Sequence, residues 1–209
     1  MRQGAPMEQT RRYVPENWLE PFRLADLFTD PAPFEVDVGC GKGRFLLARA
    51  AAHPEINYLG VDRMLRRIRK VDRKAVRAGL DNVRLLRMDA CYAVTWLIPS
   101  NCVSAYYVFF PDPWPKTKHH HHRLFDRRFM DALVRTLIPG GMVNFATDHL
   151  PYYDEVRGLL EADGRFEPAE AFVPCEEEKT DFELMFIGQK PIGRCSFRAA
   201  ARGGAEAAL

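Results

Sequence analysis

The strongest constraint on the fold is that short apolar runs alternate with segments of helical spacing along most of the chain. Because a helical crossover is the usual link between parallel strands, this alternation predicts an α/β fold with helices on both faces of a mostly parallel sheet. We expect seven strands: five at 34–38, 56–61, 83–88, 103–110 and 142–147, and two near 166–171 and 184–187. The expected helices cover about 44–52, the segment from Asp62 to about Ala78, 92–97, 124–137 and 151–162.

Four of the predicted strands end in or close to an aspartate. The residues are Asp37, Asp62, Asp89 and Asp112. The carboxyl ends of parallel strands meet at one edge of a sheet, where ligands of such folds bind, so we expect these carboxylates to lie close together. Any one of them could instead be a helix N-cap, but that role hardly explains all four.

The first predicted strand runs into a glycine-rich turn, Gly39-Cys40-Gly41-Lys42-Gly43. Gly39 and Gly41 would let the backbone approach a ligand, and an acid about 20 residues on, here Asp62, can hold ribose hydroxyls. This pattern alone would also suit NAD. At roughly 5 Å and an effective dielectric near 20, however, each carboxylate repels a phosphate charge by about 3 kcal/mol. The acids therefore favour S-adenosylmethionine, which is cationic, with Asp62 on the ribose and Asp89 on the adenine amino group.

The fourth expected strand leads into Phe109-Phe110-Pro111-Asp112-Pro113-Trp114-Pro115-Lys116. Three prolines fix their own φ and remove amide donors, which makes this proline loop stiff and extended. It presents a carboxylate, an indole and an ammonium, a set suited to nucleobase chemistry. A simple proline-rich turn with a half-buried tryptophan is the alternative.

Basic residues are concentrated in two stretches, although the net charge of the chain is only +2. Residues 63–77 contain eight lysines and arginines and one acid. Residues 116–128 contain five lysines and arginines and one acid. In the first stretch Arg66, Lys70, Arg73 and Arg77 would share a helix face opposite an apolar stripe. This concentration is typical of a nucleic-acid footprint, although a solvated helix face is the plainer explanation.

The cysteines and the hydropathy predict a reduced, cytoplasmic protein. Five scattered cysteines form no C-x-x-C pair, so neither a disulfide framework nor a zinc site is indicated. No apolar run reaches the roughly 20 residues that span a bilayer, and no signal-peptide core is present. The length of 209 residues fits a single domain. We expect a domain over 12–197, a disordered N-terminus at 1–11 and a flexible tail at 198–209.

The chain resembles the tRNA (guanine-N7-)-methyltransferases, a family with the class I Rossmann-like methyltransferase fold. The resemblance covers about Arg12 to Arg194. Its most specific carriers are the proline loop and Thr180-Asp181-Phe182-Glu183, and further carriers are residues 36–43, 59–62, 88–90 and 146–148.

The resemblance implies transfer of a methyl group from S-adenosylmethionine to N7 of a tRNA guanine, with guanine 46 of the variable loop as the family's usual target. S-adenosylhomocysteine would be the other product, and no metal is expected. The implied cofactor contacts are Asp37, Asp62, Asp89 and Asp112, with Asp112 as the catalytic acid. The implied guanosine contacts are Lys116, Asp148, Thr180, Asp181, Phe182 and Glu183.

The sequence departs from the family pattern at two places. The family more often carries Glu where Asp37 stands. The run His119–His122 falls where the family has a segment rich in His and Arg. A metal site there would lack further ligands, so we expect these histidines to face the tRNA backbone together with Arg123, Arg127 and Arg128.

Two alternative functions remain at this point. One is a methyltransferase for another RNA, and the other is a non-catalytic tRNA-binding protein on the same scaffold. No obligatory protein partner and no membrane contact are inferred, and a monomer or a homodimer is expected.

Overall fold

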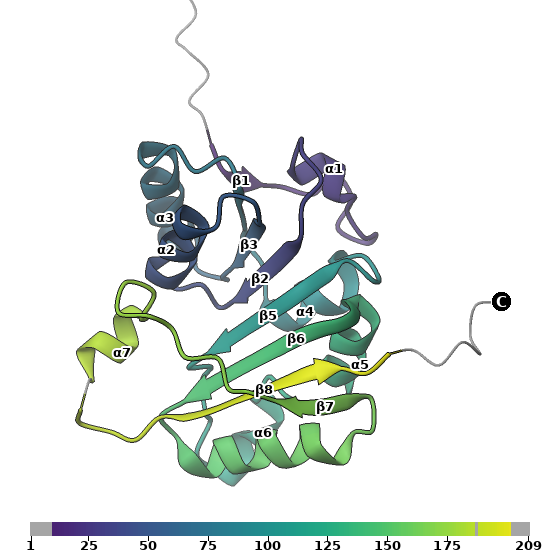
Figure 1. Ribbon diagram of the computed structural model, residues 1–209, viewed down its shortest axis with the longest axis vertical. Helices are drawn as coiled ribbons and strands as arrows, with labels where there is room; N and C mark the ends of the chain where they lie inside the picture. Colours follow the sequence, from purple (N-terminus) through teal and green to yellow (C-terminus); the bar gives the residue numbers. More distant parts are fainter. Residues whose placement is uncertain (1–9, 187, 202–209) are drawn as a thin grey trace, which may run out of the picture.

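The computed structural model describes residues 10–186 and 188–201, and these build one twisted sheet with helices on both faces (Figure 1). The strand order is β1-β4-β3-β2-β5-β6-β8-β7, and only the pairs that involve β8 are antiparallel. The strands are β1 (Arg12–Tyr13), β2 (Phe34–Val38), β3 (Asn57–Val61), β4 (Val83–Leu86), β5 (Val103–Phe109), β6 (Leu137–Thr147), β7 (Phe166–Ala169) and β8 (Gly193–Ala199). The α/β class and the mostly parallel sheet are confirmed.

The sheet has eight strands where seven were expected. The additional strand, β1, pairs with β4 through Arg12 and Tyr13 only, so it is too short to leave a periodic pattern. The strand expected at 184–187 is wrong for Leu184 and Met185, which belong to helix α7 (Asp181–Met185), and residue 187 lies outside the described residues. The last strand in the chain is β8, which begins at Gly193.

The described residues extend past the expected domain bounds at both ends. Thr10 and Arg11 are ordered against the side chain of Asp72, and β8 continues to Ala199, two residues past the expected boundary. Residues 1–9 and 202–209, where we expected disorder, lie outside the described residues.

Two sets of helices cover the two faces of the sheet. One face packs against α4 (Ala90–Tyr92), the π-helical turn η1 (Ala93–Leu97), α5 (Arg127–Thr136) and α6 (Leu150–Ala162). The other face packs against α2 (Arg44–Ala52) and α3 (Leu65–Arg77). The remaining short elements are α1 (Leu24–Leu27) and the 3-10 helix η2 (Thr117–His122).

Strand β5 illustrates why the central strands are apolar on both sides. Tyr106 and Val108 enter the core beneath α5 and α6, whereas Tyr107 and Phe109 pack with Phe45 of α2. Successive side chains of a strand point to opposite faces, so a sheet that is covered twice needs a continuous apolar run. Residues 105–109 of β5 meet that need, since all five are apolar or aromatic and buried.

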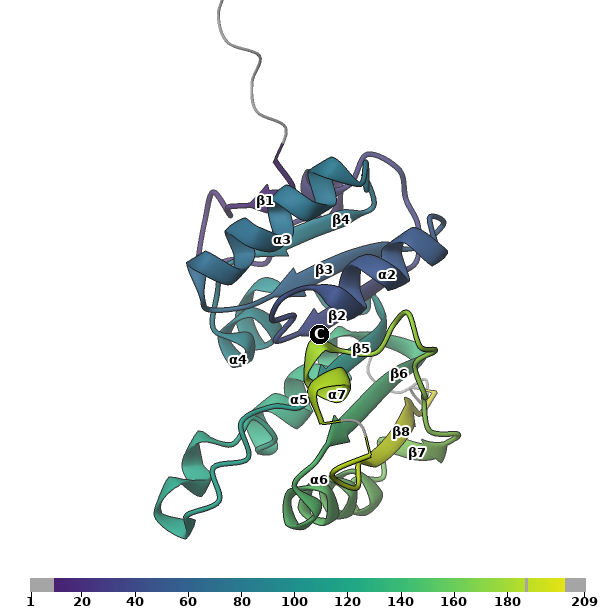
Figure 2. The same cartoon turned by 90° about the vertical axis from the view of Figure 1, so that its left-hand side faces the viewer.

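The order of the strands fixes where a ligand can bind. From β2 the chain proceeds to β3 and β4 on one side, and then crosses to β5 and β6 on the other. The crevice at such a switch point, outside the carboxyl ends of the strands, is the ligand site of open parallel sheets. In Figure 1, α7 lies beyond the carboxyl ends of β5 and β6, and in Figure 2 the segment with η2 projects from the body of the molecule.

Within the described residues, no helix combines the length and the apolar character that crossing a bilayer requires. Those residues also contain no group of three or more His, Cys, Asp or Glu side chains arranged to hold a metal ion.

Candidate functional site

Two adjoining cavities open at the carboxyl ends of β2, β3 and β5. The larger cavity has a volume of about 510 Å³ and the smaller one about 320 Å³. They share part of their walls, namely Gly39, Arg67, Phe109, Phe110 and Asp112. Both volumes lie in the range of small-molecule sites, so together they can hold an extended ligand or two neighbouring ones.

Asp62 and Asp89 line the larger cavity. The Asp62 carboxylate accepts hydrogen bonds from the amides of Met64 (2.7 Å) and Gly41 (3.2 Å), and Arg67 lies 3.3 Å away. Asp89 caps α4, because its Oδ1 accepts from the amide of Tyr92 at 3.0 Å. The N-cap alternative therefore applies to Asp89, whose second oxygen has no partner among the described residues and can still receive a ligand donor.

Asp37 lines the smaller cavity and is only 5% exposed. Among the described residues, its carboxylate accepts no hydrogen bond and has no cation beside it. Burial, with a smaller contribution from the charge of Asp62, raises the pKa of Asp37 to about 7. A buried carboxylate without a partner favours binding of a positively charged or hydrogen-donating group.

The glycine turn needs its glycines for two different reasons. Gly41 has φ +56°, a left-handed conformation that brings its amide within reach of Asp62. At Gly43, a Cβ atom would lie 2.6 Å from Val71 of α3, so this glycine permits close packing of the turn on that helix. Gly39 and Gly41 both line the smaller cavity, as the sequence predicted for a turn that approaches a ligand.

The proline loop carries Asp112 into the wall shared by both cavities, where its side chain is exposed. Two non-glycine residues near it have positive φ, Phe110 at +52° and Trp114 at +41°. Such conformations cost on the order of 1–3 kcal/mol each and persist only where the surroundings hold them. Here the amide of Phe110 donates to the carbonyl of Ala146 in β6 at 2.7 Å.

Arg123 holds the other end of the proline loop. Its guanidinium donates to the carbonyl oxygens of Pro113 (2.9 Å) and Trp114 (3.4 Å), pairs with Glu155 and lies over the ring of Tyr152. Only 8% of the residue is exposed, so the expectation that Arg123 faces tRNA is wrong. Besides Glu155, the polar partners of its guanidinium are backbone carbonyls of the loop that carries Asp112.

The histidine run forms a small ring cluster with Trp114. The centroid of His122 lies 4.8 Å from that of Trp114 and 3.9 Å from that of His121. His122 also lines the larger cavity. Loss of hydration, together with the neighbouring His121 and His119, lowers the pKa of His122, which favours the neutral ring.

Helix α7 closes one side of the smaller cavity. Thr180, Asp181 and Phe182 line that cavity, and the ring of Phe182 lies 4.7 Å from that of Phe110 in the proline loop. Glu183 points elsewhere: it completes a capping box with Thr180, pairs with Arg194 and is buried. Its carboxylate supports the helix from behind rather than lining the cavity.

Two further residues predicted to contact the substrate lie outside both cavity walls. Lys116 is exposed at the start of η2. Asp148 accepts from Lys190 Nζ at 2.7 Å. The structure therefore brings the predicted cofactor residues together with Thr180, Asp181 and Phe182. Lys116, Asp148 and Glu183 lie apart from the cavities.

Sequence reasoning missed three residues that shape the site. Arg67 lines both cavities, and its position five residues after Asp62 in a predicted helix could have indicated its contact with that carboxylate. The left-handed Phe110 leaves no local signal. Arg123 was found as part of a basic stretch, but its burial depends on Glu155, which is 32 residues away in the chain.

The family model described as "Putative methyltransferase" matches residues 31–183. A relative from Halorhodospira halophila, named tRNA (guanine-N(7)-)-methyltransferase, is 41% identical over 154 residues, which cover 72% of this chain and 67% of the relative. A relative of the same name from Thiobacillus denitrificans is 33% identical over 182 residues, covering 86% of this chain and 80% of the relative.

Solved structures support the fold. The 16S rRNA methyltransferase KamB superposes with a TM-score of 0.65 at 16% identity, covering 85% of this chain and 93% of that one. A 16S rRNA (adenine(1408)-N(1))-methyltransferase from Catenulisporales acidiphilia, solved with its cosubstrate SAM, gives 0.57 at 20% identity, covering 83% and 88%. The Rossmann-like class I methyltransferase fold expected from the sequence is confirmed.

Proposed function

The chain belongs to the tRNA (guanine-N(7)-)-methyltransferase family, and on that premise we propose that it transfers a methyl group from S-adenosylmethionine to N7 of a guanine in tRNA. The proposed target is guanine 46 in the variable loop, which is the family's usual target, and the proposed location is the cytoplasm. The observation that carries the proposal is the joined pair of acid-lined cavities at the switch point of the sheet.

The residues around the cavities fit S-adenosylmethionine. Asp37 is a buried carboxylate without a cation beside it, and the glycine turn that lines the same cavity lets a ligand approach the backbone closely. Asp62 would hold the ribose hydroxyls and Asp89 the adenine amino group, through the lone pairs that the protein leaves free. When bound, this cofactor supplies an electrophilic methyl group on a sulfonium.

Guanine N7 has a free lone pair, so no proton must leave before it reacts. The protein can therefore act mainly by holding N7 in line with the methyl group, which is worth up to about 7–11 kcal/mol of the barrier. The base gains positive charge as N7 accepts the methyl group. A carboxylate near the base stabilises that charge.

Asp112 is the residue best suited to hold the guanine. It lies in the wall common to both cavities, and its carboxylate has no partner among the described residues. It could accept from N1–H and the 2-amino group of guanine, donors that adenine lacks, which would reject adenine. We assign it positioning and base recognition rather than general-base catalysis.

Helix α7 and the outlying residues complete the proposed tRNA contacts. Thr180, Asp181 and Phe182 would meet the guanosine from the smaller cavity. Lys116 and Asp148 would contact the tRNA beyond the cavities. Glu183 would act through the helix that it caps.

The product of the reaction tests the proposal. Purified protein is incubated with tRNA and S-adenosylmethionine carrying a labelled methyl group, and the tRNA is then digested to nucleosides. We expect the label in 7-methylguanosine, and no label when guanine 46 is replaced by adenine. Label in another nucleoside would favour a different RNA methyltransferase, and no label together with tight tRNA binding would favour a binding protein.

A further inference from the structure

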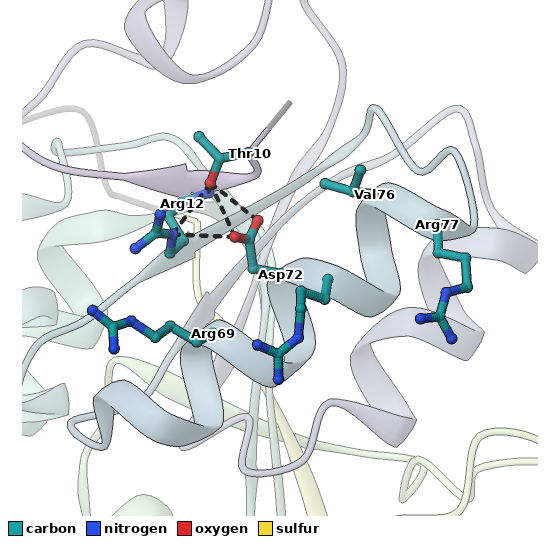
Figure 3. Close-up of a pocket in the computed structure, with 7 residues that line it drawn as sticks. Thr10, Arg12, Arg69, Asp72, Val76 and Arg77 are labelled. Atoms are coloured by element: carbon teal, nitrogen blue, oxygen red, sulfur yellow. Dashed lines mark hydrogen bonds and ion pairs between the residues drawn. The ribbon is translucent and has the colours of Figure 1, made fainter. Parts of the chain in front are cut away.

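A basic groove lies between β1 and α3, on the opposite side of α3 from the glycine turn. Its volume is about 430 Å³, and Thr10, Arg12, Arg69, Asp72, Arg73 and Arg77 line it together with Val76. None of these residues lines the larger or the smaller cavity. Figure 3 shows Thr10 and Arg12 reaching the Asp72 carboxylate from the facing strand, with Arg69 and Arg77 on α3 to either side.

Asp72 joins the two walls of the groove. Its carboxylate accepts from Thr10 Oγ1 (3.0 Å), the amide of Arg11 (2.7 Å) and Nε of Arg12 (3.1 Å). Asp72 is only 8% exposed, so the hydrogen bonds to its carboxylate come from the protein rather than from solvent. Asp72, the only acid among the residues that line the groove, therefore binds residues 10–12 and holds the Arg12 guanidinium at the groove wall.

The remaining arginines of the groove have uncompensated charge. Arg69, Arg73 and Arg77 are exposed, and none of them has an ion-pair partner among the described residues. They follow one another at four-residue steps, which places them along one line of the helix surface. A row of like charges held this closely favours a ligand that is itself a row of negative charges.

Helix α3 connects this groove to the candidate site. Arg67, which lines both cavities, lies in the first turn of the helix, and Arg77 is its last residue. At about 1.5 Å per residue, the two are separated by about 15 Å along the helix axis. That reach exceeds a single nucleoside and suits a polynucleotide that continues past the reacting base.

We propose that the groove between β1 and α3 binds the phosphate backbone of the RNA substrate, outside the cavities where methyl transfer takes place. The inference rests on the proposed function for the identity of the RNA as tRNA. It predicts that the groove contributes to tRNA affinity and to its salt dependence, while the chemical step is independent of it.

The test compares the double variant Arg69→Gln/Arg73→Gln with a charge-matched control, Arg157→Gln/Arg198→Gln. The control residues are exposed on α6 and β8, toward the other edge of the sheet. The dissociation constant for tRNA is measured by fluorescence anisotropy over a range of salt concentrations, and methylation is measured at saturating S-adenosylmethionine.

For the groove variant we expect tRNA binding about tenfold weaker and a log–log salt slope smaller by roughly 1–2, since each phosphate contact contributes about 0.7–0.9. KM for tRNA should rise, with kcat within about twofold of the unmodified protein. The control variant should change none of these by more than about twofold.

Equal affinity and equal salt slope for the groove and control variants would overturn the proposal. A fall in kcat at unchanged KM would also overturn it, because it would mean that the arginines act on the chemical step. Absence of 7-methylguanosine with the unmodified protein would refute the proposed function instead. The tRNA affinities of the groove and control variants would still decide whether the groove binds RNA.

Discussion

At the scale of single residues, the environment of Asp37 differs from that of the other acids around the cavities. Asp62 is surrounded by two backbone amides and Arg67. At Asp37, burial and the nearby charge of Asp62 both disfavour the ionised carboxylate. The folded protein therefore keeps a proton on Asp37 until the pH approaches the pKa of this group, about 7. A bound cation would favour the ionised form and release that proton.

Stability should reflect this raised pKa. Between about pH 4 and pH 7 the unfolded chain has lost the Asp37 proton and the folded chain retains it, so this group lowers stability as pH rises through that window, by on the order of 4 kcal/mol when complete. We expect Asp37→Asn to be more stable than the unmodified protein at pH 8, with little gain at pH 4. Urea unfolding of both proteins at the two pH values measures the difference. An equal gain at both values would contradict the assignment.

Ligand binding gives a second prediction for Asp37. Because a cation beside the carboxylate lowers its pKa, binding of S-adenosylmethionine at pH 6.5 should release up to about 0.8 proton, the protonated fraction at that pH. Calorimetric titrations in two buffers with different ionisation enthalpies give the number of protons released. The Asp37→Asn variant serves as the control and should lose this release. The same release in both proteins would mean that another group titrates.

At the scale of structural elements, the proline loop depends on contacts from outside itself. Phe110 and Trp114, on either side of Asp112, hold left-handed conformations, and contacts to them come from β6 and from Arg123. Arg123 is thus a positioning residue for Asp112, although it touches neither cavity.

Replacing Arg123 tests this dependence. Arg123→Gln removes the donors to Pro113 and Trp114, so Asp112 should be less well placed, and a misplacement near 1 Å can lower the rate about 100-fold. We expect kcat to fall by about 10- to 100-fold while the affinity for S-adenosylmethionine changes less than threefold. Arg157→Gln, at an exposed position of α6, is the matched control. A purely structural role would lower the melting temperature and leave kcat of the folded fraction unchanged.

Helix α7 depends on its cap in a similar way. Thr180 accepts from the amide of Glu183 at 3.1 Å, and the Glu183 carboxylate accepts from the amide of Thr180 at 2.9 Å. Thr180→Ala should lower the free energy of unfolding by about 1 kcal/mol and increase hydrogen exchange of the α7 amides. Exchange measured by mass spectrometry distinguishes this local effect from a global one. Unchanged exchange in α7 would show that the packing of Phe182 on Phe110 holds the helix without its cap.

At the scale of the whole molecule, the alternation of apolar runs and helices was enough to predict the central architecture. The five parallel strands from Phe34 onward are largely buried, and such strands leave short runs rich in apolar residues in the sequence. Strands β1 and β8 were not predicted, because their stability comes from partners distant in the chain. Tyr13 pairs with Leu86, and Cys195 pairs with Phe145.

The candidate site was predictable to a similar extent. The order of the strands brings Asp37, Asp62, Asp89 and Asp112 to one edge, and local sequence marks each of them at the end of a strand. Which carboxylates are free is a tertiary property. The cap formed by Asp89 is local, with the amide of Tyr92 three residues on, and was an alternative that the sequence offered. The pairing of Asp148 with Lys190 and of Glu183 with Arg194 depends on groups that periodicity and spacing do not reveal.

The central claim is that methyl transfer takes place where the two cavities join, at Asp112. The most direct measurement is the single-turnover rate of 7-methylguanosine formation in tRNA by Asp112→Asn, alongside its affinity for S-adenosylmethionine. We predict a rate at least about 100-fold below that of the unmodified protein, with cofactor affinity within about threefold. An unchanged rate in this variant would contradict the account.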